Sequence, residues 1–510
     1  MRINIIEYFL KTVAKYPDRI AVIEDEVKIS FKQLKERAVA VSFSLIKENK
    51  YINQPIAVYL QKSINTIEAD LAVTYSGNAY MNLDVNAPIE RVNNILNLIK
   101  PKILITDSNH LEKIKAVLKY STYIFLIDKE YLFEENQEKL LLERLTKLID
   151  TDPYCIINTS GSTGTPKGVV LNHKSFIDFT EWSCETLNIT DDEIVGALSP
   201  SIFDIYSHEL CMMMSKGSTI VLLPERLSAF PIKILEILEK ENITFIFWVP
   251  TIMVNIANMD LLTKVKLPML KTVWFAGEVL PTKQYNYWHK LLPYTRFINL
   301  YGPIEITLDC TYFIINREFN DSEPLPIGFP CRNTSILILN EHNQLCKTGE
   351  EGELCVRGTS LAMGYYNNPE RTSAAFTQNP LNKSYPEIIY RTGDIVTEND
   401  NGEIMFRGRR DTLIKHLGYR IELAEIEHIV VNVLQLINNG CVIYQSNNKE
   451  IVLVYEAVEE IPTAEFRKRI GQSLPKYMIP TKYLRLEKLP MNANGKIDRL
   501  TLNNQVINNM

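Results

Sequence analysis

The sequence predicts an α/β protein with a large N-terminal domain and a smaller C-terminal α+β domain. Three observations favour this fold class. Apolar runs alternate with amphipathic stretches over most of the chain, as strands alternate with helices. After about residue 325 the strands become shorter and are separated by turns that contain Gly and Asn. A charged turn at Gly408–Asp411 then precedes a new unit, which sets expected domains of 1–408 and 409–510.

The first part of the chain is expected to form largely parallel sheets. The chain begins with an apolar stretch that polar residues interrupt. This pattern predicts a short amphipathic helix that ends near Pro17, rather than a signal peptide. Alternating segments follow: strands at Ile56–Leu60, Lys102–Thr106, Thr219–Leu223, Thr244–Val249 and Lys271–Phe275, and helices that include Pro231–Lys240 and Ile252–Leu262.

Two further regions have their own patterns. Short runs at Ser335–Leu339, Glu353–Val356 and Glu403–Phe406 predict an antiparallel, barrel-like section. In the C-terminal part, Ile426, Ile429, Val430 and Val433 fall on one face of a helix, and the strand Ile451–Tyr455 and a helix near Thr463–Ser473 follow.

Composition excludes several function classes. The chain has 510 residues, 46% apolar and 23% charged, which is ordinary for a globular protein. Its net charge of −6 gives no reason to expect a nucleic-acid partner. No run reaches the roughly 18–20 apolar residues of a membrane span, so none is expected. The eight cysteines lie singly without metal-ligand spacing, which favours the reducing cytoplasm.

The strongest local signal is TSGSTGTPKG, Thr159 to Gly168. Glycines let the backbone approach an anion closely, successive N–H groups form an anion nest, and Lys167 adds a charge. The string differs from a Walker A loop because Pro166 precedes the lysine and Gly168 follows it. Strand-like flanks at Tyr154–Ile157 and Val169–Leu171 place it at a hairpin tip.

This loop resembles the phosphate loop of the adenylate-forming superfamily, which contains acyl-CoA synthetases, luciferases and the adenylation domains of nonribosomal peptide synthetases. Further segments match in the family's order: AGEVLP (276–281), NLYGPIE (299–305), YRTGD (390–394), GRRDTLIKHLGYRIELAEIE (408–427) and PMNANGKIDR (490–499). The resemblance spans nearly the whole chain. It implies two sheets flanked by helices, a barrel-like section and a small, mobile lid domain.

The resemblance also implies an ATP site. Glu305 would hold Mg²⁺, since hard cations prefer carboxylate oxygens. Asp394 would accept both ribose hydroxyls, and Lys496 would reach the reacting groups when the lid rotates about the hinge residues Asp411 and Lys415. Lys167, Glu305 and Lys496 are the expected catalytic residues. The expected ATP contacts are Thr159, Ser160, Gly161, Ser162, Thr163, Gly164, Gly277, Glu278, Asn299, Leu300, Tyr301, Gly302, Pro303, Ile304, Asp394, Phe406, Arg407, Gly408, Arg409 and Lys496.

Two positions depart from the family pattern. Ile304 replaces the usual Thr beside the phosphates, and Leu413 stands where the hinge commonly has Gln. Both departures leave the charged catalytic positions in place, so we expect a working enzyme.

The segment FDIYSHEL (203–210) indicates the substrate class. It resembles the segment of amino-acid-activating members whose aspartate, here Asp204, pairs with the substrate ammonium. A buried aspartate is costly unless it is paired, and fatty or aryl acids offer no partner. The rest of the expected pocket is Ile205, His208, Phe247, Trp274, Ala276, Leu300, Leu308 and Asp309, with Lys496 at the carboxylate.

Two interpretations of the pocket remain open. Asp309 pairs either with a polar or cationic substrate side chain, or with His208, which would leave room for a short aliphatic amino acid such as alanine. AGEVLP and the chain length also resemble the D-alanine–carrier protein ligases.

The expected activity is ATP-dependent formation of an aminoacyl-AMP and pyrophosphate, followed by transfer to the phosphopantetheine thiol of a carrier protein. Because only eleven residues follow PMNANGKIDR, we expect a stand-alone acid–thiol ligase and a separate acyl or peptidyl carrier protein. The alternatives are an acyl-CoA synthetase that uses free CoA, and a nucleotide-sensing protein without turnover.

Overall fold

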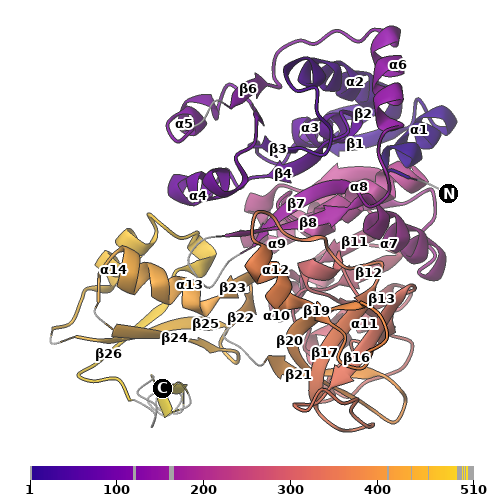
Figure 1. The fold of residues 1–510 in the computed structure, drawn as a ribbon. Coiled ribbons are helices and arrows are strands. Elements are labelled where there is room, and N and C mark those ends of the chain that lie inside the picture. The colour runs from indigo at the N-terminus through magenta and orange to yellow at the C-terminus, as the bar shows by residue number, and fades with distance from the viewer. Residues whose placement is uncertain are drawn as a thin grey trace. The chain divides into compact units, whose positions relative to one another are not determined.

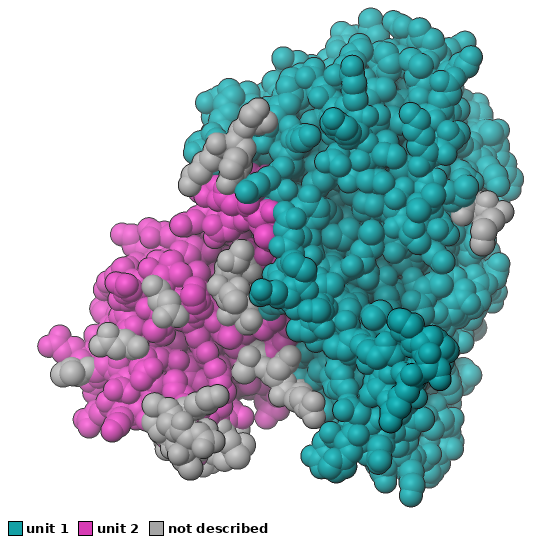
Figure 2. Space-filling view, in the orientation of Figure 1, with its two compact units in different colours: residues 1–85, 99–157, 168–410 teal, residues 86–98, 158–167, 411–510 magenta. Residues whose placement is uncertain are grey.

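The protein is described by a computed structural model over residues 3–118, 122–159, 166–409, 413–437, 439–457, 459–490, 497, 499 and 501–503. It is a mixed α/β protein (Figure 1). Two compact units are distinguished in Figure 2: residues 1–85, 99–157 and 168–410 form the first, and residues 86–98, 158–167 and 411–510 the second. The predicted domain boundary at residue 408 stays a prediction.

A nine-stranded sheet is the largest element of the first unit. Its central strands are parallel, and β2, β14 and β15 add antiparallel edges. The order is β15 (Phe329–Pro330), β14 (Thr311–Ile314), β13 (Arg296–Tyr301), β12 (Thr272–Phe275), β11 (Phe245–Trp248), β9 (Ile194–Ala197), β10 (Thr219–Leu222), β1 (Ile20–Glu24) and β2 (Val27–Ser30).

A seven-stranded sheet contains the predicted hairpin. In it β7 and β8 are neighbours, as the strand-like flanks of the glycine-rich loop predict. The order is β18 (Gly364–Tyr365), β8 (Lys167–Asn172), β7 (Pro153–Thr159), β4 (Ala79–Asn82), β3 (Pro55–Val58), β5 (Ile103–Thr106) and β6 (Tyr123–Leu126).

Successive residues of the central strands belong alternately to two hydrophobic cores, one on each face of the sheet. Phe247 and Trp274 belong to the core that also contains the helix residues Leu210 and Met213. Their neighbours Trp248 and Phe275 belong to a second core. Because both faces of these strands are buried, the sequence shows continuous apolar runs rather than alternation.

Helices surround the sheets in the order that the sequence alternation predicts (Figure 1). They are α1 (Ile6–Lys15), α2 (Phe31–Glu48), α3 (Ile64–Tyr75), α4 (Ile89–Ile99), α5 (Leu111–Lys115), α6 (Glu135–Leu145), α7 (His173–Thr186), α8 (Asp204–Lys216), α9 (Pro231–Lys240), α10 (Pro250–Asn258), α11 (Thr282–Leu291), α12 (Pro369–Ala375), α13 (Leu423–His428) and α14 (Thr463–Ile470). None of the helices in the described ranges is long and apolar enough to cross a membrane.

Three predicted helices have different bounds. The helix predicted at Ile252–Leu262 is α10 plus a 3₁₀ turn at Leu261–Lys264, because Asp260 has a positive φ of 51° and interrupts it. After α13 the chain continues as a π-helix at Ile429–Val433, which leaves Val433 half exposed while Val430 is buried. The last helix, α14, ends at Ile470, before Gly471.

The antiparallel section is a five-stranded sheet. It contains β16 (Thr334–Leu339), β17 (Gly352–Gly358), β19 (Phe376–Gln378), β20 (Ile388–Glu398) and β21 (Ile404–Arg409). The long β20 pairs with β19 through its first residues and with β21 through its last. The predicted antiparallel pairing is therefore confirmed, although over the described strands the sheet branches at β20.

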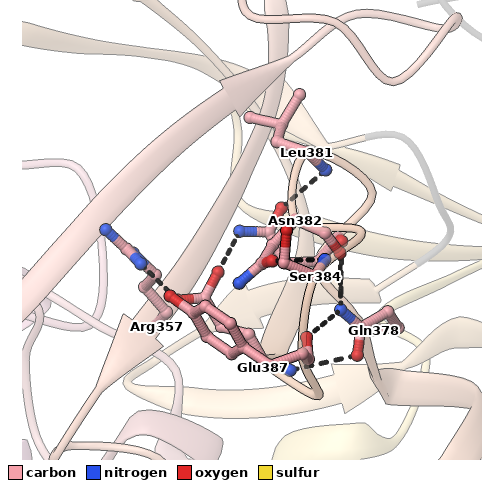
Figure 3. A network of polar contacts seen from close by, with 8 residues as sticks. Arg357, Gln378, Leu381, Asn382, Ser384 and Glu387 are labelled. Atoms are coloured by element: carbon pink, nitrogen blue, oxygen red, sulfur yellow. Dashed lines mark hydrogen bonds and ion pairs between the residues drawn. The ribbon is translucent and has the colours of Figure 1, made fainter.

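Polar side chains fix the β19–β20 connection (Figure 3). Arg357 on β17 donates to the Glu387 carboxylate, which also accepts from Asn379 Nδ2 at 2.5 Å. Gln378 Nε2 donates to the Asn382 carbonyl at 2.9 Å. A cavity of about 410 Å³ is lined by Arg357, Glu387 and neighbouring residues that include Leu361 and Ile388. Because these charged groups pair with each other, we interpret the network as support for the loop.

The second unit contains two small sheets. One is the hairpin of β22 (Leu413–His416) and β23 (Tyr419–Glu422), whose turn residues Leu417 and Gly418 both have positive φ, as a tight hairpin requires. The other consists of β24 (Asn439–Gln445), β25 (Glu450–Glu456) and β26 (Lys482–Leu486). The predicted strand at Ile451–Tyr455 is thus confirmed as β25.

Candidate active site

The loop after β13 contains three of the predicted ATP contacts, Gly302, Pro303 and Ile304, and is tightly folded. The Cys310 N–H donates to the Tyr301 carbonyl at 2.8 Å and so closes residues 302–309 into a loop. A Cβ at Gly302 would lie 2.2 Å from the Leu308 carbonyl oxygen, so only glycine fits. Thr307 and Leu308 have positive φ. This strained loop lies at the carboxyl end of a parallel strand, where α/β sheets bind ligands.

Glu305 lies within this loop and is completely buried. Its Oε1 accepts a hydrogen bond of 2.7 Å from the hydroxyl of Tyr365, on β18. Its backbone carbonyl accepts from the Ala362 N–H at 2.8 Å. The neighbouring Ile304 packs into the apolar core. The carboxylate is therefore held in one orientation, and its oxygens suit a hard cation such as Mg²⁺.

Asp394 and Tyr301 meet where the nine-stranded sheet adjoins the five-stranded sheet. The Tyr301 hydroxyl donates to Asp394 Oδ2, and Arg409 Nη1 lies 2.5 Å from Asp394 Oδ1. Burial, and then the Asp394 charge, raise the pKa of Tyr301 well above its usual value. Tyr301 is therefore a neutral donor, and the structure brings together three of the predicted ATP contacts, Tyr301, Asp394 and Arg409.

The motif YRTGD (390–394) predicts a strand that runs into a turn before Asp394, and the structure corrects this expectation. Asp394 lies inside strand β20, not after it. Gly393 has a φ of +73°, which accommodates a local irregularity while the strand continues. The Asp394 N–H donates to Thr392 Oγ1 at 3.0 Å.

Asp204 is the first residue of helix α8. Its Oδ1 accepts from its neighbour's amide, Ile205 N, at 3.0 Å, and its Oδ2 accepts from Leu308 N at 3.2 Å. A helix N-terminus favours the negative charge. The Leu308 contact places this carboxylate against the loop that contains Glu305, a juxtaposition of residues a hundred positions apart in the chain.

His208, one turn further along α8, is fully buried among aromatic rings. Its ring stacks on Trp274 at a centroid distance of 5.6 Å and meets Phe179 and Phe247 edge-on. Neither ring nitrogen has a hydrogen-bond partner, and neither has Trp274 Nε1. Burial lowers the pKa of His208 to about 3, so the ring is neutral. The expected internal pair between His208 and Asp309 is therefore not formed.

The remaining pocket residues share one core. Phe247, Trp274, Ala276, Leu300 and Leu308 are buried in the same hydrophobic cluster, and Ile205 packs against it. Asp309 is also buried. The strands place these residues together because β11, β12 and β13 are neighbours in parallel register.

Several predicted ATP contacts lie on loops of the first unit. Gly277 has a φ of 93°, and the adjacent Glu278 carboxylate accepts from the Thr251 hydroxyl. Asn299 Nδ2 donates to the Pro326 carbonyl at 2.7 Å. The other contacts are Pro303, which precedes the Glu305 turn, and Phe406, Arg407 and Gly408 on β21.

The second unit contains the start and end of the glycine-rich loop. Thr159 Oγ1 and the side chain of Asn158 are buried without hydrogen-bond partners. Lys167 Nζ lies 3.9 Å from Glu422 Oε1. Lys415, one of the two predicted hinge residues, lies on β22 and is paired in register with Arg420. Ser160, Gly161, Ser162, Thr163, Gly164, Asp411 and Lys496 lie outside the described residues.

Lys62, Asp70, Asn82 and Tyr206 were missed by sequence reasoning. They form a buried polar cluster beside the segment that leads into Asp204. Buried polar residues in otherwise apolar runs were the available signal, but residues from distant segments cannot be matched by spacing alone.

A two-layered α/β unit with these residues at the carboxyl ends of its strands is the architecture of adenylate-forming enzymes. A sequence model described as AMP-binding enzyme matches residues 9–366, so the chain belongs to this family. It is 31% identical over 506 residues to tyrocidine synthase 1 of Brevibacillus parabrevis, covering 98% of this chain and 45% of that protein. The chain spans less than half the length of the first three curated relatives that it matches.

Solved structures share the fold. The Vibrio cholerae adenylation domain AlmE, in complex with glycyl-adenosine-5′-phosphate, aligns over 100% of this chain and 98% of its own with a TM-score of 0.85 and 22% identity. PA1221, a nonribosomal peptide synthetase protein with adenylation and carrier domains, aligns over 98% and 84% with a TM-score of 0.81 and 21% identity.

Proposed function

We propose that the chain activates a small amino acid with ATP. The carboxylate oxygen of the amino acid attacks the α-phosphorus, the bond to pyrophosphate breaks, and an aminoacyl-AMP forms. The observation that supports this proposal is the contact between Asp204 and Leu308, because it holds the carboxylate proposed to bind the substrate ammonium beside the loop that contains Glu305.

The described residues support separate roles on the nucleotide. Glu305 would hold Mg²⁺ on the phosphates, because it is a buried carboxylate that the Tyr365 hydroxyl orients and carboxylate oxygens suit a hard cation. Asp394, fixed by Tyr301 and Arg409, would accept the ribose hydroxyls. Lys167 and the glycine-rich loop would take the phosphates, and Lys496 would contact the reacting carboxylate.

The pocket supports a small substrate. Three rings that contact one another would fill its base: His208 stacks on Trp274, and Phe247 meets both of them edge-on. The glycyl adenylate held by AlmE is itself an adenylate of a small amino acid. The proposal includes both D-alanine and a small polar or cationic amino acid. The polar or cationic amino acid is included because Asp309 and His208 are polar residues of the expected pocket.

The acyl acceptor in this proposal is a phosphopantetheine thiol. The thiol sulfur attacks the carbonyl carbon of the adenylate, and AMP leaves with the bonding electrons, so the chain acts as an acid–thiol ligase. PA1221, which joins an adenylation domain to a carrier domain, supports a carrier protein as the partner. The free thiols of all eight cysteines suit the proposed location in the cytoplasm.

ATP–pyrophosphate exchange with a panel of L- and D-amino acids tests the proposal, with fatty and aryl acids as controls. We expect exchange with glycine, alanine or another small amino acid. Exchange only with acids that lack an amine would overturn the role of Asp204 and favour an acyl-CoA synthetase.

A further inference from the structure

The segment between β9 and α8 is held by a buried lysine. Lys62, which follows β3, donates from Nζ to the carbonyls of Ala197, Leu198 and Ser199 at 3.1, 3.0 and 3.1 Å. All three donors of the ammonium group are therefore used on three consecutive peptide groups. These peptide groups lie a few residues before Asp204.

A second set of contacts holds the end of this segment and the first turn of α8. Asn82, the last residue of β4, donates from Nδ2 to the Ser201 carbonyl at 3.1 Å and to Asp70 Oδ2 at 3.0 Å. The Tyr206 hydroxyl donates to the same Asp70 oxygen at 2.8 Å. Asp204 thus lies between two points, Ser201 and Tyr206, that are tied to one buried carboxylate.

Stability alone does not account for this cluster. Lys62 and Asp70 are buried, and burial lowers the pKa of Lys62 while the charges of Glu225 and Glu209 raise it. Burial also raises the pKa of Asp70 to about 7. Buried charged groups are often replaceable by apolar residues without loss of stability. A cluster directed at one backbone segment instead fixes the position of that segment.

We propose that Lys62, Asp70, Asn82 and Tyr206 are positioning residues that set the place of the Asp204 carboxylate for the substrate ammonium. This inference rests on the proposed function. Lys62 follows β3, Asp70 lies on α3 and Asn82 ends β4, whereas Tyr206 lies on α8 itself. In this proposal the four residues act on the segment between β9 and α8 and do not touch the substrate.

The geometry explains why such support is needed. The segment leaves the sheet after Ala197 and contains Pro200, which donates no hydrogen bond. The Ala197 and Pro200 carbonyls accept from backbone N–H groups. The carbonyls of Leu198, Ser199 and Ser201 accept instead from the side chains of Lys62 and Asn82. A displacement of about 1 Å at a substrate-binding group can cost roughly a hundredfold in rate, even when the changed residue lies outside the reacting shell.

The test compares Lys62→Met and Tyr206→Phe with the unchanged full-length chain, using ATP–pyrophosphate exchange with the amino acid to which it responds best. We expect Lys62→Met to raise the KM for the amino acid about tenfold or more and Tyr206→Phe to raise it severalfold, with the KM for ATP within about twofold. Lys62→Arg should recover part of the loss, because it retains a cationic donor.

Matched controls separate positioning from general damage. Lys233→Met changes an exposed lysine that pairs with Glu236 on α9, and should leave both KM values unchanged. Tyr206→Phe removes one hydroxyl and keeps the ring, so it tests the idea even where Lys62→Met fails to fold. Equal rises in the KM for ATP and the amino acid, or a lower melting temperature with unchanged KM values, would overturn the proposal.

The same assay distinguishes failure of the proposed function. If the unchanged chain exchanges only with acids that lack an amine, the proposed function is wrong. If it exchanges with an amino acid but the Tyr206→Phe variant has the KM values of the unchanged chain, the positioning proposal alone is wrong.

Discussion

Two buried polar clusters of the first unit differ in which of their polar atoms have hydrogen-bond partners. Around Lys62 and Asp70, the ammonium group, the Asn82 amide nitrogen and the Tyr206 hydroxyl all donate to protein acceptors, whereas the acceptors Asp70 Oδ1 and Asn82 Oδ1 have no partner. Around His208, both ring nitrogens and the Trp274 indole nitrogen have none. Since buried polar groups are nearly always paired, this difference separates a framework whose donors the chain satisfies from a pocket whose nitrogen atoms suit a ligand.

The largest effect is expected at Asp204, the residue whose carboxylate the Lys62 and Asp70 contacts are proposed to position. Asp204→Ala should lower kcat/KM for the amino acid roughly a hundredfold or more, because a substrate ammonium in the pocket would lose its counter-charge. ATP binding, measured by calorimetry, should be unchanged. Loss of ATP affinity in parallel would show instead that Asp204 supports the 302–309 loop through Leu308.

A second large effect is expected at Glu305. Glu305→Gln keeps the shape of the side chain and its contact with Tyr365, but removes the charge. The Mg²⁺ concentration for half-maximal exchange should rise about tenfold or more, because an amide is a weaker ligand for a hard cation. An unchanged Mg²⁺ dependence with lower thermal stability would assign Glu305 to the fold alone.

An intermediate effect is expected at Asp394, whose carboxylate contacts both Tyr301 and Arg409. Asp394→Asn should raise the KM for ATP about tenfold while the KM for the amino acid changes little, since charge-assisted hydrogen bonds are worth about 1.5–3 kcal/mol. Kinetics with 2′-deoxy-ATP provide the control. If the variant discriminates against the deoxy nucleotide as strongly as the unchanged chain does, Asp394 does not bind the ribose.

The smallest effect, and the sharpest test of the comparison, is expected at His208. His208→Leu removes unpartnered polar atoms and should leave stability near neutral pH within about 1 kcal/mol. At acidic pH, the low pKa of His208 determines the direction in which the free energy of unfolding changes. The folded pKa of about 3 lies below the usual value of His, so the unfolded chain binds the extra proton and the contribution of His208 falls between roughly pH 6.5 and 3.

Denaturant unfolding at several pH values measures this contribution. The difference between His208→Leu and the unchanged chain should grow in favour of the variant as the pH falls. A difference that is independent of pH would mean that the His208 ring is solvated. The variant should also exchange with larger apolar amino acids if the ring closes the pocket base.

The need for glycine after Tyr301 could be predicted from the sequence because it depends on local chemistry, whereas the roles of the carboxylates stay predictions. The loop from Tyr301 to Cys310 needs glycine at position 302 for a steric reason that acts over a few residues. The strand runs were found for a similar reason, since burial of both faces of a parallel sheet leaves a continuous apolar segment. The bounds of α10 and the π-helix at Ile429–Val433 were missed, because a single positive φ or an extra residue in a turn leaves the apolar pattern nearly unchanged.

The sequence by itself determined the fold class, the family and the types of residue available at the site. These follow from periodicity, glycine positions and charged groups at fixed spacing. Only the tertiary structure decided that Asp204 lies against Leu308, that His208 stacks on Trp274 away from any polar partner, and that Lys62 binds the segment before α8. The physical reason is that hydrogen bonding and burial depend on distances between atoms, and sheet packing sets those distances for residues far apart in the chain.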